Sequence, residues 1–467
     1  MPNLTFIGAT RQVTGSCYLL ESGPHQILLD CGLYQGSFRT EEQNRHPFVF
    51  SVGKLDAVIL SHSHLDHCGL LPKLVKEGYK GPIYMTPATS DLIEIMLADA
   101  AYLELKDTEW ENKQRARGGK SAIEPLYTLE DVNQVLLLRN IIPYQQPTGI
   151  TPNITLTYYD AGHILGSAVV EIRIQSGAKM KTLVFSGDLG NDDNALLDTP
   201  AVLDRSDVLL LESTYGDRNH RSFADTLVEF KQALDRAAET GGNVLIPSFA
   251  VGRTQDILFW LGKFYQEGKL KQQQVFLDSP MAIAASQLYL KHLHLFNEDD
   301  ARLFRDTAKK NWNEWLPNLK YTRTTEESMQ INNISGGAII IAGSGMCTGG
   351  RIRHHLKNNL WRNNTHVIIV GFQAQDTLGR ALVDGAKNIS VFGKEVSVNA
   401  TIHTLGGFSA HADQSHLLKW AGHFQAPLPE LFLVHGELEK MLELQEQFHQ
   451  RHHWHANIPK PGERIHF

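Results

Sequence analysis

The sequence predicts an α/β fold in which a β-rich first domain, covered by helices, is interrupted by a second domain built on a parallel sheet. Short strand patterns separated by turns open the chain, an apolar strand then ends in a histidine-rich loop, and strands alternate with helices after residue 207. A chain of 467 residues is too long for one ordinary core. We therefore expect two domains, or one domain with a large insertion.

The first domain is expected to span residues 1–207. Its strand patterns occupy residues 4–8, 16–21, 26–30, 57–60, 154–159, 168–174 and 182–185. Helix formers dominate residues 86–138, between the two groups of strands. Within them the charged stretch 107–120 ends in two glycines, which suggests a helical hairpin or lid.

The second domain is expected to span residues 208–395, because strand and helix patterns alternate there as in a parallel sheet covered by helices. The strands are predicted at 208–212, 243–247, 274–278, 337–342 and 366–371, and the first two helices at 223–239 and 253–267. Histidines return in the strand patterns that follow. Residues 396–467 are therefore expected to rejoin the first domain.

Composition narrows the class of protein. The chain is 42% hydrophobic and 20% charged, as in a soluble globular enzyme, and its 22 histidines point to metal chemistry. A net charge of -7 argues against nonspecific coating of nucleic acid, although a local basic groove remains compatible. The four cysteines lack CxxC spacing, which disfavours a disulfide framework or a zinc ribbon. Without a leader or a membrane-length apolar run, we expect a cytoplasmic protein with no membrane partner.

The sharpest motif is His62-x-His64-x-Asp66-His67, which places four possible metal ligands on one loop after a buried strand. A loop can direct His62 and His64 to one ion and Asp66 and His67 to a second. The plain alternative is a solvated histidine-rich loop. The residue types, their order and their position at a strand end favour zinc.

Two further strand ends offer the remaining ligands. His163 follows one strand in DAGHILGS, and Asp188 follows another in FSGDLGN. Taken singly, each is more often a turn or capping residue. Together with the first motif they favour a metal site, in which the short carboxylate of Asp188 could bridge two ions with a hydroxide between them as nucleophile.

This pattern resembles the metallo-β-lactamase superfamily, whose ordered motifs are an early Asp, HxHxDH, a later His and a later Asp. The resemblance implies an αββα sandwich. It also implies that the early aspartate, Asp30 in LLDCG, binds no metal but supports the histidine loop by hydrogen bonds. A turn role for Asp30 is the alternative.

The insertion resembles the β-CASP group of nucleases. The group's motif A acidic residue corresponds to Glu212 in LLLESTYGDR, its motif B histidine to His411 in GFSAHAD, and its motif C residue to His435 in LVHGE. The resemblance implies that His411 is a general acid oriented by Glu212. It implies two ligand sets that share Asp188: His62, His64 and His163 for one zinc ion, and Asp66, His67 and His435 for the other.

Motif C also bears on the substrate, since a histidine there accompanies RNA processing in this group and a valine accompanies DNA repair. Phosphate contacts are expected from residues near glycines or helix starts, and the candidates are Ser248, Arg253, Ser344 and Arg351. Structural turns with solvated arginines are the alternative. The chain ends soon after motif C, so it resembles the minimal bacterial type of the group, without KH or extra C-terminal domains.

The working hypothesis is a dinuclear zinc ribonuclease, in which Asp66 and Asp188 hold the ions and His411 protonates the departing 3′ oxygen of single-stranded RNA. The site is expected between the domains, beside a basic rim that includes Arg218. Two alternatives are a thioester or small-ester hydrolase and a catalytically silent RNA-binding subunit. The sequence leaves open endonuclease against exonuclease action, replacement of zinc by Mn²⁺ or Fe²⁺, and whether the chain forms a homodimer.

Overall fold

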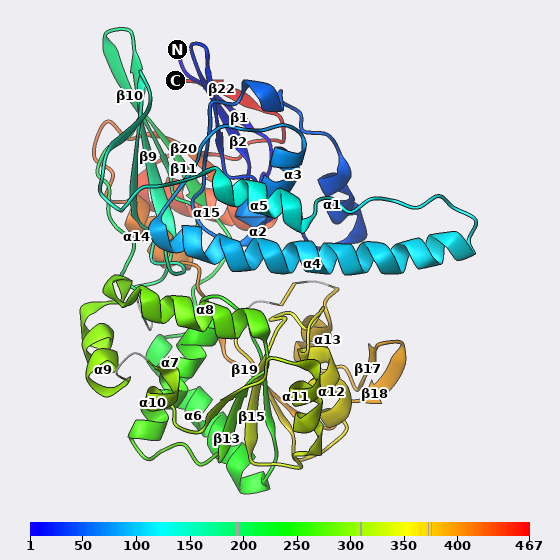
Figure 1. Cartoon of the computed structure of the whole chain (residues 1–467). Coiled ribbons are helices and arrows are strands. Elements are labelled where there is room, and N and C mark those ends of the chain that lie inside the picture. The colour runs from blue at the N-terminus through cyan, green and yellow to red at the C-terminus, as the bar shows by residue number, and fades with distance from the viewer. Residues whose placement is uncertain (193–195, 309–310, 372, 375) are drawn as a thin grey trace. The chain divides into compact units, whose positions relative to one another are not determined.

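A computed structural model describes residues 1–192, 196–308, 311–371, 373–374 and 376–467. The chain forms two compact units (Figure 1). Unit 1 contains residues 1–192, 199–219 and 411–467, and unit 2 contains residues 220–410 with the short segment that ends at Asp198.

The units divide about a dozen residues later than the sequence patterns suggest, at 219/220 and 410/411 rather than 207/208 and 395/396. Strand β11 (Val208–Glu212) pairs with two strands of unit 1, so it does not begin the insertion. Strand β19 (Thr401–Thr404) pairs with a strand of unit 2, so it does not rejoin unit 1. Apolar β strands look alike in sequence whichever sheet they join, and only their partners distinguish them.

Unit 1 contains two seven-stranded sheets. In spatial order, the first consists of β22 (Arg464–His466), β1 (Asn3–Phe6), β2 (Tyr18–Ser22), β3 (His25–Leu29), β4 (Ala57–Ile59), β5 (Ile83–Met85) and β6 (Arg139–Ile141). The second consists of β21 (Ala456–Asn457), β20 (Glu430–Val434), β11, β10 (Lys179–Phe185), β9 (Ala168–Ser176), β8 (Ile154–Asp160) and β7 (Thr148–Thr151).

The two sheets pack face to face, because alternate side chains along each strand point to opposite sides. Ile27 and Leu29 of β3 enter the core between the sheets, whereas Leu28 points to the outer helices. Across this core the ring centroids of Tyr18 and Phe185 lie 5.3 Å apart. The predicted αββα sandwich is confirmed.

Helices cover the outer faces of both sheets. On the side of the first sheet lie α1 (Phe38–Glu42), α2 (Leu65–Cys68), α3 (Leu71–Lys76), α4 (Pro87–Arg117) and α5 (Leu129–Leu137), and on the side of the second lie α14 (Gln414–Ala421) and α15 (Leu438–His452). Short 3₁₀ turns occur at Gln43–Arg45 and Val52–Lys54, and in unit 2 at Leu293–Leu295, Ile331–Asn333 and Gly406–Phe408.

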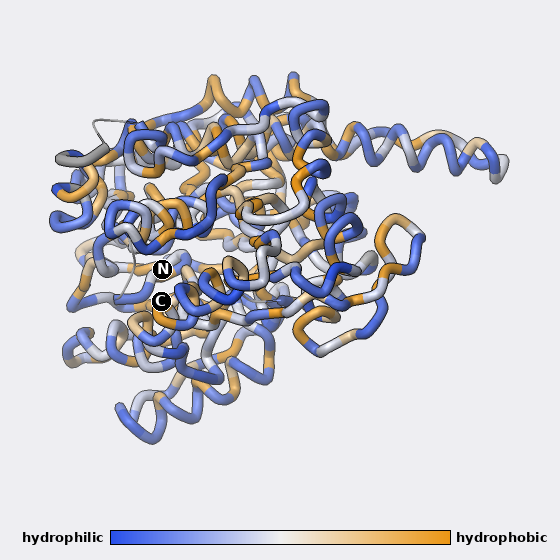
Figure 2. The backbone as a smooth tube through the Cα atoms, turned by 90° about the horizontal axis from the view of Figure 1, so that it is seen from below, coloured by the Kyte–Doolittle hydropathy of each residue, from blue (hydrophilic) through white to orange (hydrophobic). Residues whose placement is uncertain are grey.

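Residues 107–120, predicted as a helical hairpin or lid, instead form the end of one long helix, and an irregular segment runs back along that helix. Helix α4 continues unbroken to Arg117, and its far end is mostly hydrophilic (Figure 2). The chain then returns without helix, bonded to α4 by the Asn112 amide, which pairs with both backbone groups of Ile123 at 2.8 and 2.9 Å. Although α4 has 31 residues, no helix in the described residues is long and apolar enough to cross a bilayer.

Unit 2 is built on a six-stranded sheet whose strands all run parallel. The sheet order is β14 (Leu319–Tyr321), β13 (Gln274–Leu277), β15 (Ala338–Ala342), β12 (Val244–Pro247), β16 (His366–Ile369) and β19, and a separate hairpin pairs β17 (Asn388–Val391) with β18 (Lys394–Ser397). The helices are α6 (Phe223–Thr240), α7 (Arg253–Gln266), α8 (Pro280–Lys291), α9 (Glu298–Ala308), α10 (Trp312–Trp315), α11 (Thr325–Gln330), α12 (Ile352–Asn359) and α13 (Leu378–Val383). The predicted alternation of strands and helices in this region is confirmed.

Candidate metal centre

Strand ends in unit 1 deliver the candidate ligands to one place. Strands β10, β11 and β20 are parallel neighbours, so their carboxyl ends meet at the same edge of the second sheet. Asp188 follows β10, Glu212 ends β11 and His435 follows β20. From the first sheet, β4 leads into His62 and His64. Asp66 and His67 then lie on the short helix α2, not on a loop as predicted.

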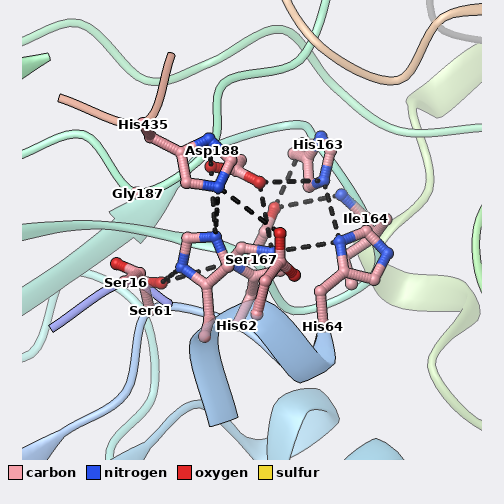
Figure 3. A network of polar contacts seen from close by, with 12 residues as sticks. Ser16, Ser61, His62, His64, His163, Ile164, Ser167, Gly187, Asp188 and His435 are labelled. Atoms are coloured by element: carbon pink, nitrogen blue, oxygen red, sulfur yellow. Dashed lines mark hydrogen bonds and ion pairs between the residues drawn. The ribbon is translucent and has the colours of Figure 1, made fainter. Parts of the chain in front are cut away.

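Three imidazoles and one carboxylate form the first ligand group (Figure 3). The Nε2 atoms of His62 and His163 lie 3.1 and 3.2 Å from Nδ1 of His64. The same two Nε2 atoms lie 3.4 and 3.6 Å from Oδ2 of Asp188. His62, His163 and Asp188 are almost fully buried, so these ring nitrogens face one another rather than water.

Two further imidazoles and a second carboxylate form another group beside the first. Nε2 of His67 lies 3.1 Å from Nε2 of His435, and Oδ2 of Asp66 lies 3.4 Å from the latter atom. Asp188 faces this group with its other oxygen, because Oδ1 lies 3.4 Å from both Nε2 of His67 and Nδ1 of His435. Asp188 therefore stands between the two groups.

The spacing of these atoms fits a metal ion. Zinc binds imidazole nitrogen at about 2.0–2.1 Å with tetrahedral geometry, so neighbouring ligand atoms should lie about 3.3–3.4 Å apart. The measured separations in the first group run from 3.1 to 3.6 Å. Among the described residues, the buried Oδ1 of Asp188 accepts no hydrogen bond. A buried carboxylate oxygen without a donor is costly unless a cation satisfies it.

Electrostatics keeps the first group ready to bind a cation. Burial lowers the pKa of His64 to about 4 and that of His62 well below its usual value, so both rings are neutral at pH 7 with a nitrogen lone pair available. Burial raises the pKa of Asp188, but the surrounding imidazoles of His435, His67 and His62 outweigh it and lower that pKa. The carboxylate is therefore ionised.

Asp30 supports this arrangement from behind, as the resemblance implies. Its Oδ2 accepts from Nδ1 of His67 at 2.7 Å and from the hydroxyls of Ser61 and Ser16 at 2.9 and 3.0 Å. Its Oδ1 accepts from the backbone N–H of Ser61 at 2.8 Å. Such a carboxylate fixes which nitrogen of His67 faces the centre. Burial lowers the pKa of His67, but Asp188 and Asp30 outweigh it and raise that pKa.

His411 and Glu212 lie beside the ligand groups, within unit 1. Nδ1 of His411 is 3.3 Å from Oε1 of Glu212 and 3.9 Å from Oδ2 of Asp188. Glu212 is itself held, since it accepts the backbone N–H of Leu189 at 2.8 Å and that of Thr214 at 3.3 Å. Burial lowers the pKa of His411, but the negative charges of Glu212 and Asp188 raise it to about 9.

The four predicted phosphate-binding residues all lie in unit 2. Ser248 and Ser344 follow the neighbouring parallel strands β12 and β15, but the side chain of Ser248 is buried and bonded to Thr254. The guanidinium of Arg253 pairs with Asp256 at 2.9 Å. That of Arg351 pairs with Asp278 at 2.7 Å and donates to two backbone carbonyls. Their phosphate binding stays a prediction.

Three residues near the ligands were missed by the sequence reasoning. The hydroxyl of Ser61 lies 3.1 Å from Nδ1 of His62, and that of Thr214 lies 3.1 Å from Nδ1 of His435. The Asn191 amide donates to the carbonyl oxygen of His411 at 2.7 Å. Ser61 directly precedes His62, and Thr214 comes two residues after Glu212. The one sequence signal that could have identified these residues was their position next to a predicted motif.

Three domain families match the chain. The Metallo-beta-lactamase superfamily domain matches residues 19–214, the Beta-Casp domain matches 254–382, and the Zn-dependent metallo-hydrolase RNA specificity domain matches 395–459. The first match contains every candidate ligand except His435, and the last contains His435. The last of these matches names zinc, which agrees with the histidine and aspartate ligands of the site.

Curated relatives align along nearly the whole chain. Ribonuclease TTHA0252 of Thermus thermophilus is 40% identical over 439 residues, which cover 94% of each chain. Transcription termination factor FttA is 32% identical in both Methanocaldococcus jannaschii and Methanosarcina mazei, where the alignments cover 94% and 96% of this chain and 68% and 69% of those proteins. The chain therefore belongs to the β-CASP group of the metallo-β-lactamase superfamily and is a metal-dependent hydrolase.

Proposed function

We propose that the chain is a dinuclear zinc ribonuclease that cleaves phosphodiester bonds within single-stranded RNA. The observation that carries the proposal is the position of Asp188, whose two oxygens face two separate ligand groups. RNA as substrate is supported by the name of the relative from Thermus thermophilus and by the matched RNA specificity domain.

In this proposal His62, His64 and His163 hold one ion, Asp66, His67 and His435 hold the other, and Asp188 belongs to both. When bound, the two ions would supply Lewis-acid polarisation of the scissile phosphate and lower the pKa of water. Mn²⁺ is a possible substitute, since imidazole and carboxylate ligands accept it. Asp30 would keep His67 oriented toward the second ion.

His411 is proposed as the general acid. Burial lowers its pKa, but the negative charge of Glu212 raises it, and Glu212 orients the ring through Nδ1. The opposite nitrogen, Nε2, would give its proton to the 3′ oxygen as the bond from that oxygen to phosphorus breaks and a water-derived oxygen bonds to phosphorus. The products would be a 3′-hydroxyl and a 5′-phosphate.

The decisive experiment compares two substrates with different leaving groups. His411→Ala should slow cleavage of a labelled single-stranded RNA by about 10²–10⁴-fold, because an alkoxide leaves poorly without a proton. Hydrolysis of bis(p-nitrophenyl) phosphate should fall far less, because p-nitrophenolate needs no proton. Equal losses on both substrates would contradict the general-acid role.

The substrate and the mode of cleavage are tested with the wild-type chain. Internally cleaved products from single-stranded RNA, formed equally from 5′-phosphate and 5′-hydroxyl ends, would support endonuclease action. A ladder that starts at the 5′ end would indicate an exonuclease instead. Metal analysis of the purified chain should give two zinc ions.

A cytoplasmic location agrees with the four cysteines, all of which are free and buried.

A further inference from the structure

One surface of unit 2 combines exposed aromatic rings with cations. Helix α12 buries Ile352 and Leu356 against Ile389 and Val391 of the β17–β18 hairpin. Arg353, His354 and Lys357 of α12 are at least partly exposed beside the hairpin, whereas His355 is buried, and Figure 1 shows the two elements side by side. We call this face the α12–hairpin surface; it consists of Arg353, His354, Lys357, Trp361, Arg362 and Phe392.

Phe392 stands at the tip of the hairpin in an unusual backbone conformation. Its φ is 52° and that of the next residue, Gly393, is 70°, as in a tight hairpin turn that normally carries Asn or Asp before Gly. A bulky side chain is strained there. Phe392 is nevertheless 44% exposed, and the guanidinium carbon of Arg353 and the ring centroid of His354 lie 4.3 and 4.6 Å from the centroid of its ring.

A second pair of the same kind lies in the turn that follows α12. Trp361 is 55% exposed, and the guanidinium carbon of Arg362 lies 5.3 Å from its ring. The chain after β18 is bonded to this turn, since the Asn399 amide donates to the carbonyl of Trp361 at 2.9 Å. The second pair therefore lies next to the base of the hairpin, and the first pair lies at its tip.

The charge of this region is mostly positive. No acidic residue occurs between Glu327 and Asp376, in a chain whose net charge is -7, and the hairpin strand β18 carries Lys394 and one exposed acidic residue, Glu395. Within the described residues, Arg353, Lys357 and Arg362 form no ion pair, so their charges are not neutralised by the protein itself. Burial lowers the pKa of His354, and the positive charges of Lys357 and Arg353 lower it further.

We propose that the α12–hairpin surface is a second contact site for single-stranded RNA, which stacks bases on Phe392 and Trp361 and binds phosphates through Arg353, Lys357 and Arg362. Aromatic rings interleaved with cations are typical of surfaces that bind single strands without sequence preference. The proposal rests on the proposed function, because it takes RNA as the substrate. An acidic protein segment would match the charge but would not need the exposed rings.

The test measures binding separately from cleavage. In the full chain carrying His411→Ala, which keeps RNA intact, fluorescein-labelled U20 is titrated at several salt concentrations. Phe392→Ala with Arg353→Ala should weaken binding by about tenfold, since stacking and cation contacts each contribute. The logarithmic salt slope should shrink by about 0.7 for the one removed charge. Phe392→Ala with Arg353→Lys keeps the charge, so it should retain the salt slope and lose affinity.

The matched control removes an equivalent pair from unit 1. Tyr102 is 59% exposed with the ammonium of Lys106 at 5.9 Å, and Tyr102→Ala with Lys106→Ala should leave U20 affinity unchanged. In an otherwise wild-type chain, the α12–hairpin variant should raise KM for RNA and leave hydrolysis of bis(p-nitrophenyl) phosphate unchanged.

Wild-type affinity and salt slope in the Phe392 and Arg353 variant would overturn the proposal. So would poly-glutamate binding that is as tight as U20 binding and equally weakened by the variant, because that would indicate an acidic protein partner. If the wild-type chain cleaved no RNA, the proposed function would be refuted. The U20 titration would still show whether the α12–hairpin surface binds RNA.

Discussion

Two buried aspartates follow parallel strands, one in each unit, and their surroundings are opposite. Asp278 of unit 2 accepts from the hydroxyls of Thr322 and Ser328, both at 2.6 Å, from Arg351 at 2.7 Å and from His355 at 2.6 Å. Asp188 of unit 1 is ringed by imidazoles, and its Oδ1 accepts no hydrogen bond within the described residues. The protein's own donors satisfy the first carboxylate, whereas in the proposed site an ion would satisfy the second.

Asp278 and Asp188 show how a structural carboxylate differs from a candidate metal ligand. Both are fully or almost fully buried, and both have a lowered pKa, which is about 2 for Asp278. Burial and charge therefore do not distinguish them. The distinguishing feature is whether donors already occupy the oxygens.

The largest effect is expected from Asp188→Asn. The amide removes the negative charge that both ligand groups share, so zinc content should fall below one ion per chain. RNA cleavage should fall on the order of a thousandfold or more, because the catalytic groups act as a unit. Metal analysis and a cleavage assay measure this. If the variant kept two zinc ions and intact activity, the shared-ligand scheme would be refuted.

Asp278→Asn should show the reverse pattern. It leaves Arg351 and His355 without their buried partner, and breaking such a pair costs about 3–5 kcal/mol. Denaturant unfolding should record that loss, whereas the zinc content of the folded fraction should stay at the wild-type value. A drop in zinc content without a change in stability would contradict the contrast between the two aspartates.

Asp30→Asn should have a smaller effect on the metal. It keeps the shape of the side chain but weakens the orientation of His67, and losing such a support typically costs about 10–100-fold in metal affinity or activity. Competition with a zinc chelator measures the affinity. Ser16→Ala, which removes only one of the bonds to Asp30, is the matched control and should change affinity less.

The smallest effect is expected at low pH from Asp278. Its folded pKa, of about 2, lies below the unfolded value of about 3.9, so its contribution of about 2.6 kcal/mol is present above pH 4 and is lost as pH falls toward 2. Burial raises this pKa, but the bonds from His355, Ser328, Thr322 and Arg351 lower it.

Ser328→Ala tests the direction of this pH dependence. Removing this donor should destabilise the chain by about 1.5 kcal/mol at pH 6. The difference from wild type should shrink at pH 3, because loss of the donor raises the folded pKa of Asp278 in the variant, which then takes up a proton while the wild-type carboxylate is still mostly ionised. Unfolding curves at both pH values measure it, and a larger difference at pH 3 would contradict the assignment.

The fold was predictable where periodicity is strong. The apolar end of β3 before a turn and the run of apolar strands in unit 2 carry their own signal. The unit boundaries were not predictable, because β11 and β19 reveal their sheets only through their partners. The form of α4 and of the segment that runs back along it depended on side-chain bonds from Asn112 to the returning chain.

For the candidate centre, the cluster of His62, His64, Asp66 and His67 was readable because four ligand types fall within six residues. Glu212, His411 and His435 came from resemblance alone, since isolated residues this far apart in sequence carry no pattern. Ser61 and Thr214 were missed because hydroxyls are common at strand ends. The ion pair between Arg351 and Asp278 was equally invisible, since it joins residues 73 positions apart.

The pairing of β20 with β11 has a consequence for synthesis on the ribosome. All strands of unit 2 lie between Val244 and Thr404, so every strand of that unit has been made before β20 emerges. The second sheet of unit 1 lacks an internal strand until Glu430–Val434 has been translated. The N-terminal unit is therefore the last to be finished, against the usual order of co-translational folding. A nascent chain stalled before residue 430 would carry a folded insertion on an unfinished host that still lacks His435.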